Sequence, residues 1–529
     1  MANRYWVGGT ADWDATAGTK WATTSGGAGG AAVPTTADAV IFDAASGANI
    51  VTLGSGYNPD IFLLQMTGFT GTLAFGSQNI SVSGTGTIYT GATTFSVTGT
   101  PVINCTNATA TARTIAPTAV TEANAISFNI TAGTGTVTIN SSSNIKNLNF
   151  TGFAGTLANA SRILYGNLII SSGMTLTAGV NITTFAATSG IQLITTNGKT
   201  LDFPITQNGA GGTVQLQDNL TMGSTRTYTL TNGALDLNNL ILSAGIFNSN
   251  NSNTRSIAFG TGKIIVSGGG SSLSYWDVRT TTNFTYTGTS NVEFTYSGAT
   301  GTRIISHGHT AGGSESNAIS VKIIAGTDNV SFASQAFIKD ADFTGYSGAM
   351  TPAFNLYGNL IFSATQTISA SNTGLTIAGT SGTQQITMNG LTYDRNIVFN
   401  GVGGTFAFQD AFTQGSTKTF TLTNGTVRLK NGVTSTVGAF TTSGTNQKFL
   451  QSTTLGSTAT LSQASGTVDA SYLTIQDITA IGGATFNAFT DQSNVDAGNV
   501  EGWDFGISPI VGGAEYTYAL RSLTEQRRF

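Results

Sequence analysis

The two histidines of the chain, His307 and His309, lie two residues apart in the stretch IISHGHTAGGSESN at positions 304 to 317. In a β-strand, side chains at positions i and i+2 point to the same face, so two imidazoles at this spacing could chelate a metal ion. In a threefold trimer, three such pairs would surround a single ion. No carboxylate or cysteine ligand stands directly beside the pair, and the sequence favours the alternative, an exposed polar loop.

The carboxylates do not form a second candidate site. Glycoside hydrolysis needs two carboxyl groups about 5 to 10 Å apart, and Asp and Glu together number 25 in 529 residues. Asp218 and Asp410 occupy matching positions in VQLQD and FAFQD, beside a turn, where an aspartate typically hydrogen-bonds to the backbone. Asp236 matches Arg428, and a position that accepts either sign of charge belongs to a solvated face. We therefore predict no catalytic residue and no enzyme activity.

Other chemical motifs are missing from the sequence. It contains no P-loop, no G-x-S-x-G elbow and no Cys/His cluster, so we expect no cofactor. The one cysteine, Cys105, cannot form an internal disulfide, and we expect it to fill a small apolar position in the strand PVINC. The row TKTFTLT at 417 to 423 predicts an outward threonine face.

The stretches that would position these side chains occur twice in the sequence, as an internal repeat. GGTVQLQDNLTMGSTRTYTLTNGALDL occupies 211 to 237 and GGTFAFQDAFTQGSTKTFTLTNGTVRL occupies 403 to 429, an offset of 192 residues. A period of two in the large apolar residues indicates short strands with one buried face. MGST, QGST and TNG predict the turns between these strands. The alternating apolar residues include Val214 and Leu216 in the first copy and Phe406 and Phe408 in the second.

The repetition covers two units, at about 95 to 283 and about 284 to 470. Short strands at even spacing, few charges and a continuous supply of apolar residues predict an all-β fold, a right-handed parallel β-helix or β-solenoid. Each coil would bury the inner face of its neighbour. An array of β-sandwiches is the alternative, but the strands are shorter than sandwich strands and no Trp or Tyr-corner pattern recurs.

Four segments are predicted along the chain: an N-terminal cap module at 1–60, a solenoid with the first repeat unit at 61–283, the second repeat unit with C-terminal coils at 284–490, and an end cap with a helical docking tail at 491–529. Three tryptophans of the N-terminal cap would cover the open end of the solenoid: Trp6, Trp13 and Trp21.

The C-terminal tail has apolar residues at helical spacing and several arginines, as expected of a peptide that folds on docking. We predict that it attaches the protein to a neighbouring subunit through Tyr516, Leu520, Leu523, Arg521, Arg527 and Arg528. A helix folded back on the last coil is the alternative, and the N-terminal cap would then be the anchor.

Composition restricts the partners. Charged residues make up 9% of the chain, against roughly 25% in an ordinary soluble domain. With a net charge of −4 and no run of Lys or Arg, nucleic acid is a poor partner. The start, MANRYWVGG, lacks the features of a signal peptide, and no apolar stretch of about 20 residues appears, so we expect neither a Sec leader nor membrane insertion.

Several stretches resemble the repeat-rich β-solenoid structural proteins of marine and freshwater tailed bacteriophages: RYWVGGTADWDATAGTKWATTSGGAGGAAVPTTADAVIFDAAS, NFTGFAGTL, TFAATSGIQLITTNGKTLDFPITQNGAGGTVQLQD, NTRSIAFGTGKIIVSG and ASYLTIQDITAIGGATFNAF. The resemblance covers nearly the whole chain. It implies a non-enzymatic, rod-like virion protein (an appendage, fibre or decoration) that assembles with other virion proteins in the host cytoplasm and meets host or environmental surface glycans.

The same resemblance implies a homotrimer, although a single chain is the alternative because coil stacking already buries the inner faces of the strands. Two other functions stay open. The N-terminal W-x-G-G pattern also resembles the heads of secreted bacterial β-helical adhesins, and a polysaccharide depolymerase can be built on a β-helix.

Overall fold

The structure is a computed structural model that describes residues 1–509. The chain is all-β, with 49% of its residues in strands and 2% in helices, and parallel coils stack into a β-solenoid of about 21 turns. This confirms the predicted solenoid and excludes the array of sandwiches. The chain divides into two compact units, Met1–Asp328 and Asn329–Phe529. The segment boundaries drawn from the repeats stay a prediction.

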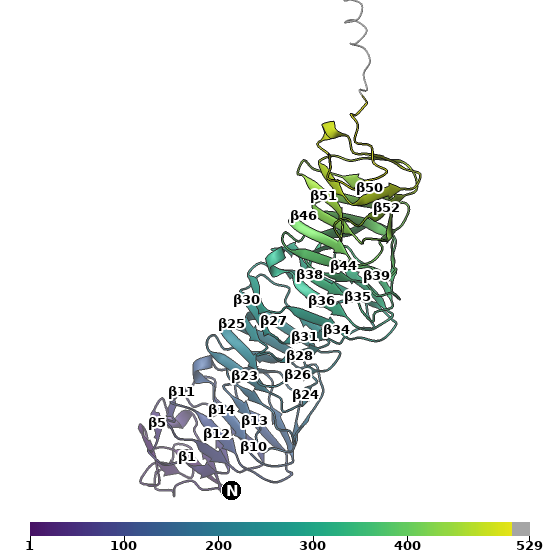
Figure 1. The fold of residues 1–529 in the computed structure, drawn as a ribbon. Helices are drawn as coiled ribbons and strands as arrows, with labels where there is room; N and C mark the ends of the chain where they lie inside the picture. The colour runs from purple at the N-terminus through teal and green to yellow at the C-terminus, as the bar shows by residue number, and fades with distance from the viewer. Residues whose placement is uncertain (510–529) are drawn as a thin grey trace, which may run out of the picture. The chain divides into compact units, whose positions relative to one another are not determined.

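In the first unit, successive coils place parallel strands beside one another (Figure 1). β25 (Ile205–Leu216) pairs with β27 (Thr227–Asp236), and β27 pairs with β30 (Arg255–Gly260). Val214, Leu235 and Ile257 therefore lie side by side in register. A second row of the same coils consists of β24 (Thr200–Leu201), β26 (Leu220–Met222), β28 (Ile241–Ala244) and β31 (Lys263–Val266).

The second unit repeats this arrangement. Phe406, Val427 and Leu450 are in register on three neighbouring strands. The strands of this row are β46 (Arg395–Phe408), β48 (Thr419–Leu429), β51 (Lys448–Ser452) and β54 (Leu473–Gln476). A second row consists of β45 (Thr392–Tyr393), β47 (Thr413–Gln414), β49 (Thr434–Val437), β52 (Ala459–Gln463) and β55 (Ile478–Ile481).

The side chains alternate between core and surface as the sequence predicts. The four apolar residues used for the prediction are at most 1% exposed: Val214, Leu216, Phe406 and Phe408. Asp236 and Arg428 lie on the opposite face, half-buried, where they hydrogen-bond to Gln215 and Gln451. The matching positions of the two repeats thus occupy matching environments.

The TNG stretches differ from the prediction, because they lie inside continuous strands and do not form turns. Gly233 in β27 and Gly425 in β48 have φ angles of 84° and 85°, which an L-residue with a side chain rarely adopts. A Cβ atom at Gly233 would lie 2.4 Å from the Gly209 carbonyl oxygen. The register of β25 and β27 shifts at this point. The glycines therefore bend each strand through a bulge, so that one strand serves two sides of its coil.

An aromatic cluster fills the N-terminal end of the first unit. β1 (Ala2–Trp6) pairs antiparallel with β3 (Trp21–Ala22), while the stacked coils pair in parallel. The three tryptophans of this end are fully buried around one phenylalanine, with ring centroids 5.1 to 6.3 Å apart: Trp6, Trp13, Trp21 and Phe42. The cluster supplies the apolar contacts that a further coil would otherwise provide.

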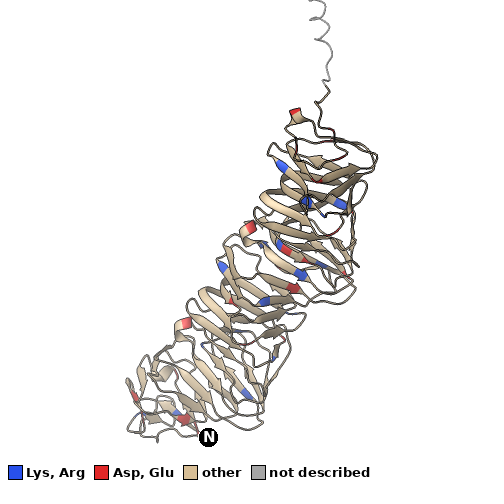
Figure 2. Ribbon diagram, in the orientation of Figure 1, with Lys and Arg blue, Asp and Glu red and all other residues tan. Residues whose placement is uncertain are grey.

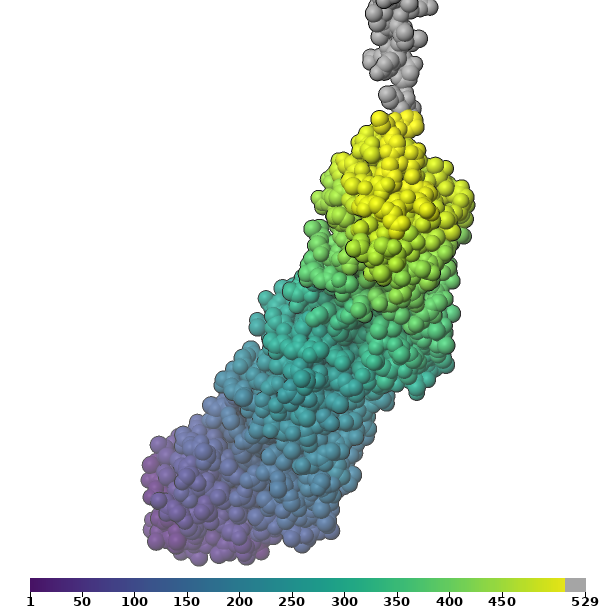
Figure 3. Space-filling model, in the orientation of Figure 1, coloured from purple at the N-terminus to yellow at the C-terminus, as the bar shows by residue number. Residues whose placement is uncertain are grey.

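Each unit presents a mostly uncharged surface. Figure 2 shows that charged residues occupy only a few short stretches of the ribbon in each unit. In Figure 3, colours follow one another gradually over the surface of each unit, because every coil contributes a narrow layer. Within residues 1–509, no helix has the length and apolar character needed to cross a membrane.

Candidate functional site

The predicted histidine pair lies in β35 (Thr302–Ala311), and His307 is fully buried, which differs from the exposed loop that the sequence favoured. Trp276 Nε1 donates a hydrogen bond of 3.3 Å to His307 Nδ1, and His307 Nε2 lies 2.7 Å from the Asn317 carbonyl oxygen. Because Nδ1 accepts, Nε2 carries the proton and donates. Burial lowers the pKa of His307 to about 4, so the ring is neutral at pH 7. With both nitrogens engaged, the geometry does not support a chelating pair.

His309 does not share the environment of His307. Gly308 between them has a φ angle of 66°, and the partner strand β32 (Leu273–Thr280) shifts register nearby, so the alternation of side chains is broken. His309 is half-buried near Asp277 and Arg279, and burial, followed by the charge of Arg279, lowers its pKa. Asp277 accepts two hydrogen bonds from Arg279, at 2.9 and 2.8 Å. No group of three or more His, Cys, Asp or Glu side chains within residues 1–509 is placed to hold a metal.

Asp218 and Asp410 hydrogen-bond to the backbone, as predicted, but their partners belong to the preceding coil. Asp218 accepts from the Thr196 amide at 2.8 Å and from the Asn197 amide. Asp410 accepts from the amides of Met388, at 2.8 Å, and Asn389. Each carboxylate thus holds a turn of the coil before it, which explains why the residue occurs twice at the same place.

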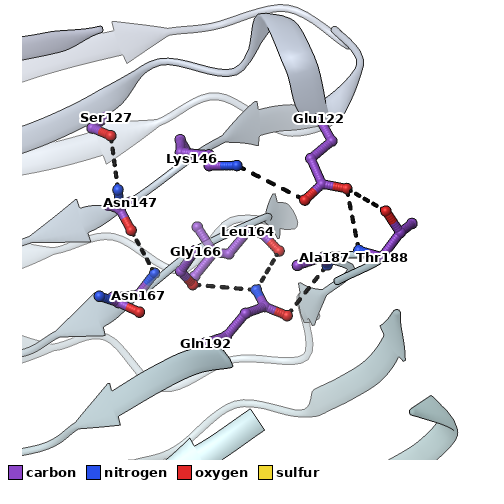
Figure 4. A network of polar contacts seen from close by, with 10 residues as sticks. All are labelled: Glu122, Ser127, Lys146, Asn147, Leu164, Gly166, Asn167, Ala187, Thr188 and Gln192. Atoms are coloured by element: carbon purple, nitrogen blue, oxygen red, sulfur yellow. Dashed lines mark hydrogen bonds and ion pairs between the residues drawn. The ribbon is translucent and has the colours of Figure 1, made fainter. Parts of the chain in front are cut away.

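A polar network on the first unit joins several coils (Figure 4). Glu122 Oε2 accepts from the Thr188 hydroxyl at 2.8 Å and the Thr188 amide at 3.2 Å, and Glu122 Oε1 lies 3.8 Å from Lys146 Nζ. Close by, Gln192 Nε2 donates to the carbonyl oxygens of Leu164 and Gly166 at 2.9 and 3.2 Å. Every drawn contact links residues of different coils or fixes a turn, so the network braces the stack.

The glutamate of this network is not a convincing general acid. Both of its carboxylate oxygens have partners, and the nearest basic group, Lys146, is also exposed to solvent. The second repeat has the same residue types at the matching positions, Glu315, Lys339 and Thr380. Residue types that recur in both repeats are better explained by the architecture than by a single reaction.

Buried cations are the largest group of side chains that the sequence analysis missed. Six basic residues are at most 3% exposed: Arg113, Arg162, Arg255, Arg303, Arg395 and Lys448. Arg255, for example, donates to the carbonyl oxygens of Asn253 and Thr282 at 2.8 and 2.9 Å. Its guanidinium carbon lies 5.4 Å from the centroid of the Phe284 ring. Backbone carbonyls and ring faces replace water around the charge.

A signal for these cations exists in the sequence. Each of the six lies two residues before an inward-facing Ile or Leu: Ile115, Leu164, Ile257, Ile305, Ile397 and Leu450. Because strand positions i and i+2 share a face, the phase of the alternation already places these basic residues inside. In Arg303 the charge also meets a carboxylate, since its Nε and Nη2 donate to Asp328 at 2.8 Å each.

A hollow of about 250 Å³ lies on the outer face of the second unit. Three amide side chains from three neighbouring strands line it: Asn355 in β40 (Phe354–Leu356), Asn372 in β43 (Ser371–Ile377) and Asn396 in β46. Thr376 and Val398, which are in register with Asn355, form its wall. Of the described residues that line this hollow, none carries a formal charge.

A bulge forms one side of the hollow, and two buried cations hold it in place. Ser371 pairs with Arg395 and Leu375 with Ile397, so the residues between Ser371 and Leu375 leave the ladder. Arg395 donates to the Thr373 carbonyl oxygen at 2.5 Å. Lys418 donates to Asn372 Oδ1 at 3.3 Å. The oxygen of this amide is therefore engaged, and its Nδ2 group is the part that can donate to a ligand in the hollow.

Comparison of the chain with protein-family models, with curated proteins and with solved structures returned no match.

The structure brings together few of the residues predicted from the sequence. The histidines are separated by Gly308, and the aspartates of the two repeats serve separate turns. The predicted attachment residues lie outside the described residues: Tyr516, Leu520, Leu523, Arg521, Arg527 and Arg528. The hollow was not predicted, because its amides are separated in sequence and meet only through the stacking of the coils and the bulge between Ser371 and Leu375.

Proposed function

We propose that the protein is a non-enzymatic structural component of a bacteriophage particle, an appendage, fibre or decoration whose solenoid acts as a stiff spacer. The observation that carries the structural role is the hydrogen bonding of side chains from coil to coil. In the second unit, Asn424 Nδ2 donates to Asn400 Oδ1 at 2.7 Å, and Asn446 Nδ2 donates to Asn424 Oδ1 at 2.8 Å. Such ladders add cohesion along the stack beyond the strand pairing itself.

The first unit contains the same kind of ladder. Asn104 Nδ2 donates to Asn79 Oδ1 at 2.9 Å, and Asn129 Nδ2 donates to Asn104 Oδ1 at 3.0 Å. Asparagine side chains that form the same hydrogen bond on successive coils are expected in a protein with a mechanical, structural role. The assignment to a phage particle rests on the resemblance of the sequence stretches quoted above.

The carboxylates support a role without catalysis. Asp218 and Asp410 are held by backbone amides, and Asp328 is held by Arg303 in the core. A glycosidase needs two carboxyl groups that face one substrate, one of them protonated. Carboxylates committed to turns and to a buried ion pair do not offer that pair.

The decisive experiment is quantitative mass spectrometry of purified particles from a culture that expresses the chain. We expect many copies per particle. Recovery of the chain in the cell-envelope fraction and its absence from particles would contradict the proposal and favour the adhesin.

Incubation with host envelope glycans tests the depolymerase. We expect neither new reducing ends nor unsaturated sugars, and either product would transfer the function to an enzyme. Deletion of residues 508–529 tests the attachment hypothesis: loss of the chain from particles would assign the anchor to the tail, and unchanged incorporation would assign it to residues 1–60.

A further inference from the structure

The hollow of the second unit occurs at a place where the two repeats differ. Its three amides have apolar counterparts in the first repeat: Asn355 matches Ile163, Asn372 matches Val180, and Asn396 matches Pro204. Val180 is 77% exposed, so the first repeat shows solvent an apolar side chain where the second shows an amide. The fold accepts both sets of residues, and the amides are therefore not needed for the architecture.

An aromatic pair stands beside the hollow. Phe337 in β38 (Ala336–Asp342) is in register with Asn355, and its ring stacks on that of Tyr357 with centroids 6.0 Å apart and an interplanar angle of 14°. Both rings are half-buried on the outer face. In the first repeat, Asn144 occupies the place of Phe337 and donates a hydrogen bond of 3.1 Å to the Tyr165 hydroxyl. The stacked pair is thus also specific to the second unit.

We propose that this hollow binds a pyranose ring of a neutral saccharide. A pyranose ring has C–H groups on its faces and hydroxyl groups around its rim. The negative faces of aromatic rings attract the C–H groups, and amides and hydroxyls supply both donors and acceptors for the rim. Asn355 Nδ2 donates to the Gln335 carbonyl oxygen at 3.3 Å, and Asn396 Oδ1 accepts from the Thr419 amide at 2.9 Å. The lining therefore presents Asn355 Oδ1 as an acceptor and the Nδ2 groups of Asn372 and Asn396 as donors, together with the hydroxyls of Thr373 and Thr376.

The charge of the lining decides the class of saccharide. The basic groups nearest the bulge, Arg395 and Lys418, are at most 9% exposed and donate to oxygens of the bulge itself. They fix the shape of the hollow and do not present their charge to a ligand. A neutral saccharide meets uncharged partners there, whereas an acidic one would not find a free cation in the lining.

The proposal predicts a single site in each chain, because the first repeat lacks the amides. It rests on the proposed function, since a structural protein holds a saccharide without cutting it. The saccharide-binding proposal and the proposed structural function can fail independently of each other. Saccharide binding is measured on the isolated chain, and incorporation is measured on particles.

Isothermal titration of the full chain with neutral oligosaccharides (maltohexaose, cellohexaose, chitohexaose and mannohexaose) tests the proposal, with oligogalacturonate as the acidic comparison. We expect one neutral sugar to bind at one site per chain. Asn355→Ile and Asn372→Val, which introduce the residues of the first repeat, should each weaken binding about tenfold or more, because sugar hydroxyls lose a partner. Thr441→Val, an exposed threonine of β50 (Ala439–Thr442) in the same unit, is the matched control and should leave binding unchanged.

Three outcomes overturn the proposal: no binding of any neutral sugar, binding of oligogalacturonate alone, or equal binding by the wild-type chain and both asparagine variants. Unchanged circular dichroism and thermal midpoints of the variants would show that any loss of binding is local.

Discussion

The guanidinium carbon of Arg162 lies 5.7 Å from the centroid of the Phe203 ring in the core of the first unit. Arg162 is 2% exposed and donates hydrogen bonds to the carbonyl oxygens of Ala158 and Ala160. In the second repeat the two residue types are exchanged: Phe354 stands at the position of Arg162, and Arg395 stands at the position of Phe203. One cation and one ring at these two positions is thus a property that both repeats keep.

Exchanging Arg162 and Phe203 in the first unit should restore the stability that each single substitution removes. Arg162→Phe leaves buried carbonyls without a donor, and Phe203→Arg places a second cation beside the first. We expect each to lower the free energy of unfolding by about 3 kcal/mol. The double variant should lie within about 1 kcal/mol of the wild type. Chemical denaturation with hydrogen exchange at these coils measures the effect, and a double variant as unstable as the sum of both single variants would contradict it.

Acidification should destabilise the first unit through His307. Burial holds the pKa of His307 at about 4, below its ordinary value of 6.5, so the folded chain keeps the ring neutral while the unfolded chain takes up a proton. The unfolded state binds more protons between these two pH values, and stability therefore falls as the pH is lowered through that window. The loss should reach on the order of 3 kcal/mol at pH 4.

Thermal unfolding of the wild type and of His307→Gln from pH 7.5 to 4 measures this contribution. At pH 7.5 the variant should be less stable than the wild type, since Trp276 and the Asn317 carbonyl lose their partner. Its stability should, however, fall less steeply as the pH is lowered. His309→Gln, at a half-buried position, should change the slope less. Equal slopes in the wild type and the His307 variant would show that this ring is already solvated.

Asp218→Ala and Asp410→Ala should cost similar amounts of stability. Each change leaves backbone amides of the preceding coil without their acceptor, with an expected cost of about 1 to 3 kcal/mol. The two share no partner, so their effects should add in the double variant. Asp236→Ala, on the solvated face, is the control and should cost no more than about 0.5 kcal/mol. A clear difference between the stability costs of the two substitutions would mean that the two repeats are not equivalent at this turn.

Trp13→Ala should destabilise the N-terminal end of the first unit. The ring is fully buried against Trp21 and Phe42, with centroids 5.3 and 5.8 Å away, and its removal leaves a cavity. Such truncations cost about 3 to 5 kcal/mol. Asp12→Ala, at the adjacent exposed position, should have little effect. Hydrogen exchange should show faster opening of the first coils in the tryptophan variant, and unchanged protection would exclude a capping role for the cluster.

The sequence by itself determined the period of the fold and the direction of its side chains. The alternation that places Val214 and Phe406 in the core is a local property of extended chain, and duplication marks it at an offset that chance does not produce. The same alternation contained the buried cations, but basic residues are ordinarily read as solvent-facing. Arg162 and Arg395 are inside because the coil supplies carbonyls and rings around them.

Tertiary structure alone decided which residues meet. His307 and His309 are separated by the left-handed backbone of Gly308, which spacing does not reveal. Asn355, Asn372 and Asn396 come together because β40, β43 and β46 pair in parallel, with Asn355 in register with Thr376 and Val398, and because the bulge between Ser371 and Leu375 brings Asn372 into the same hollow. That register is fixed by the burial of the inward side chains, and a shift of one residue would turn every side chain to the other face.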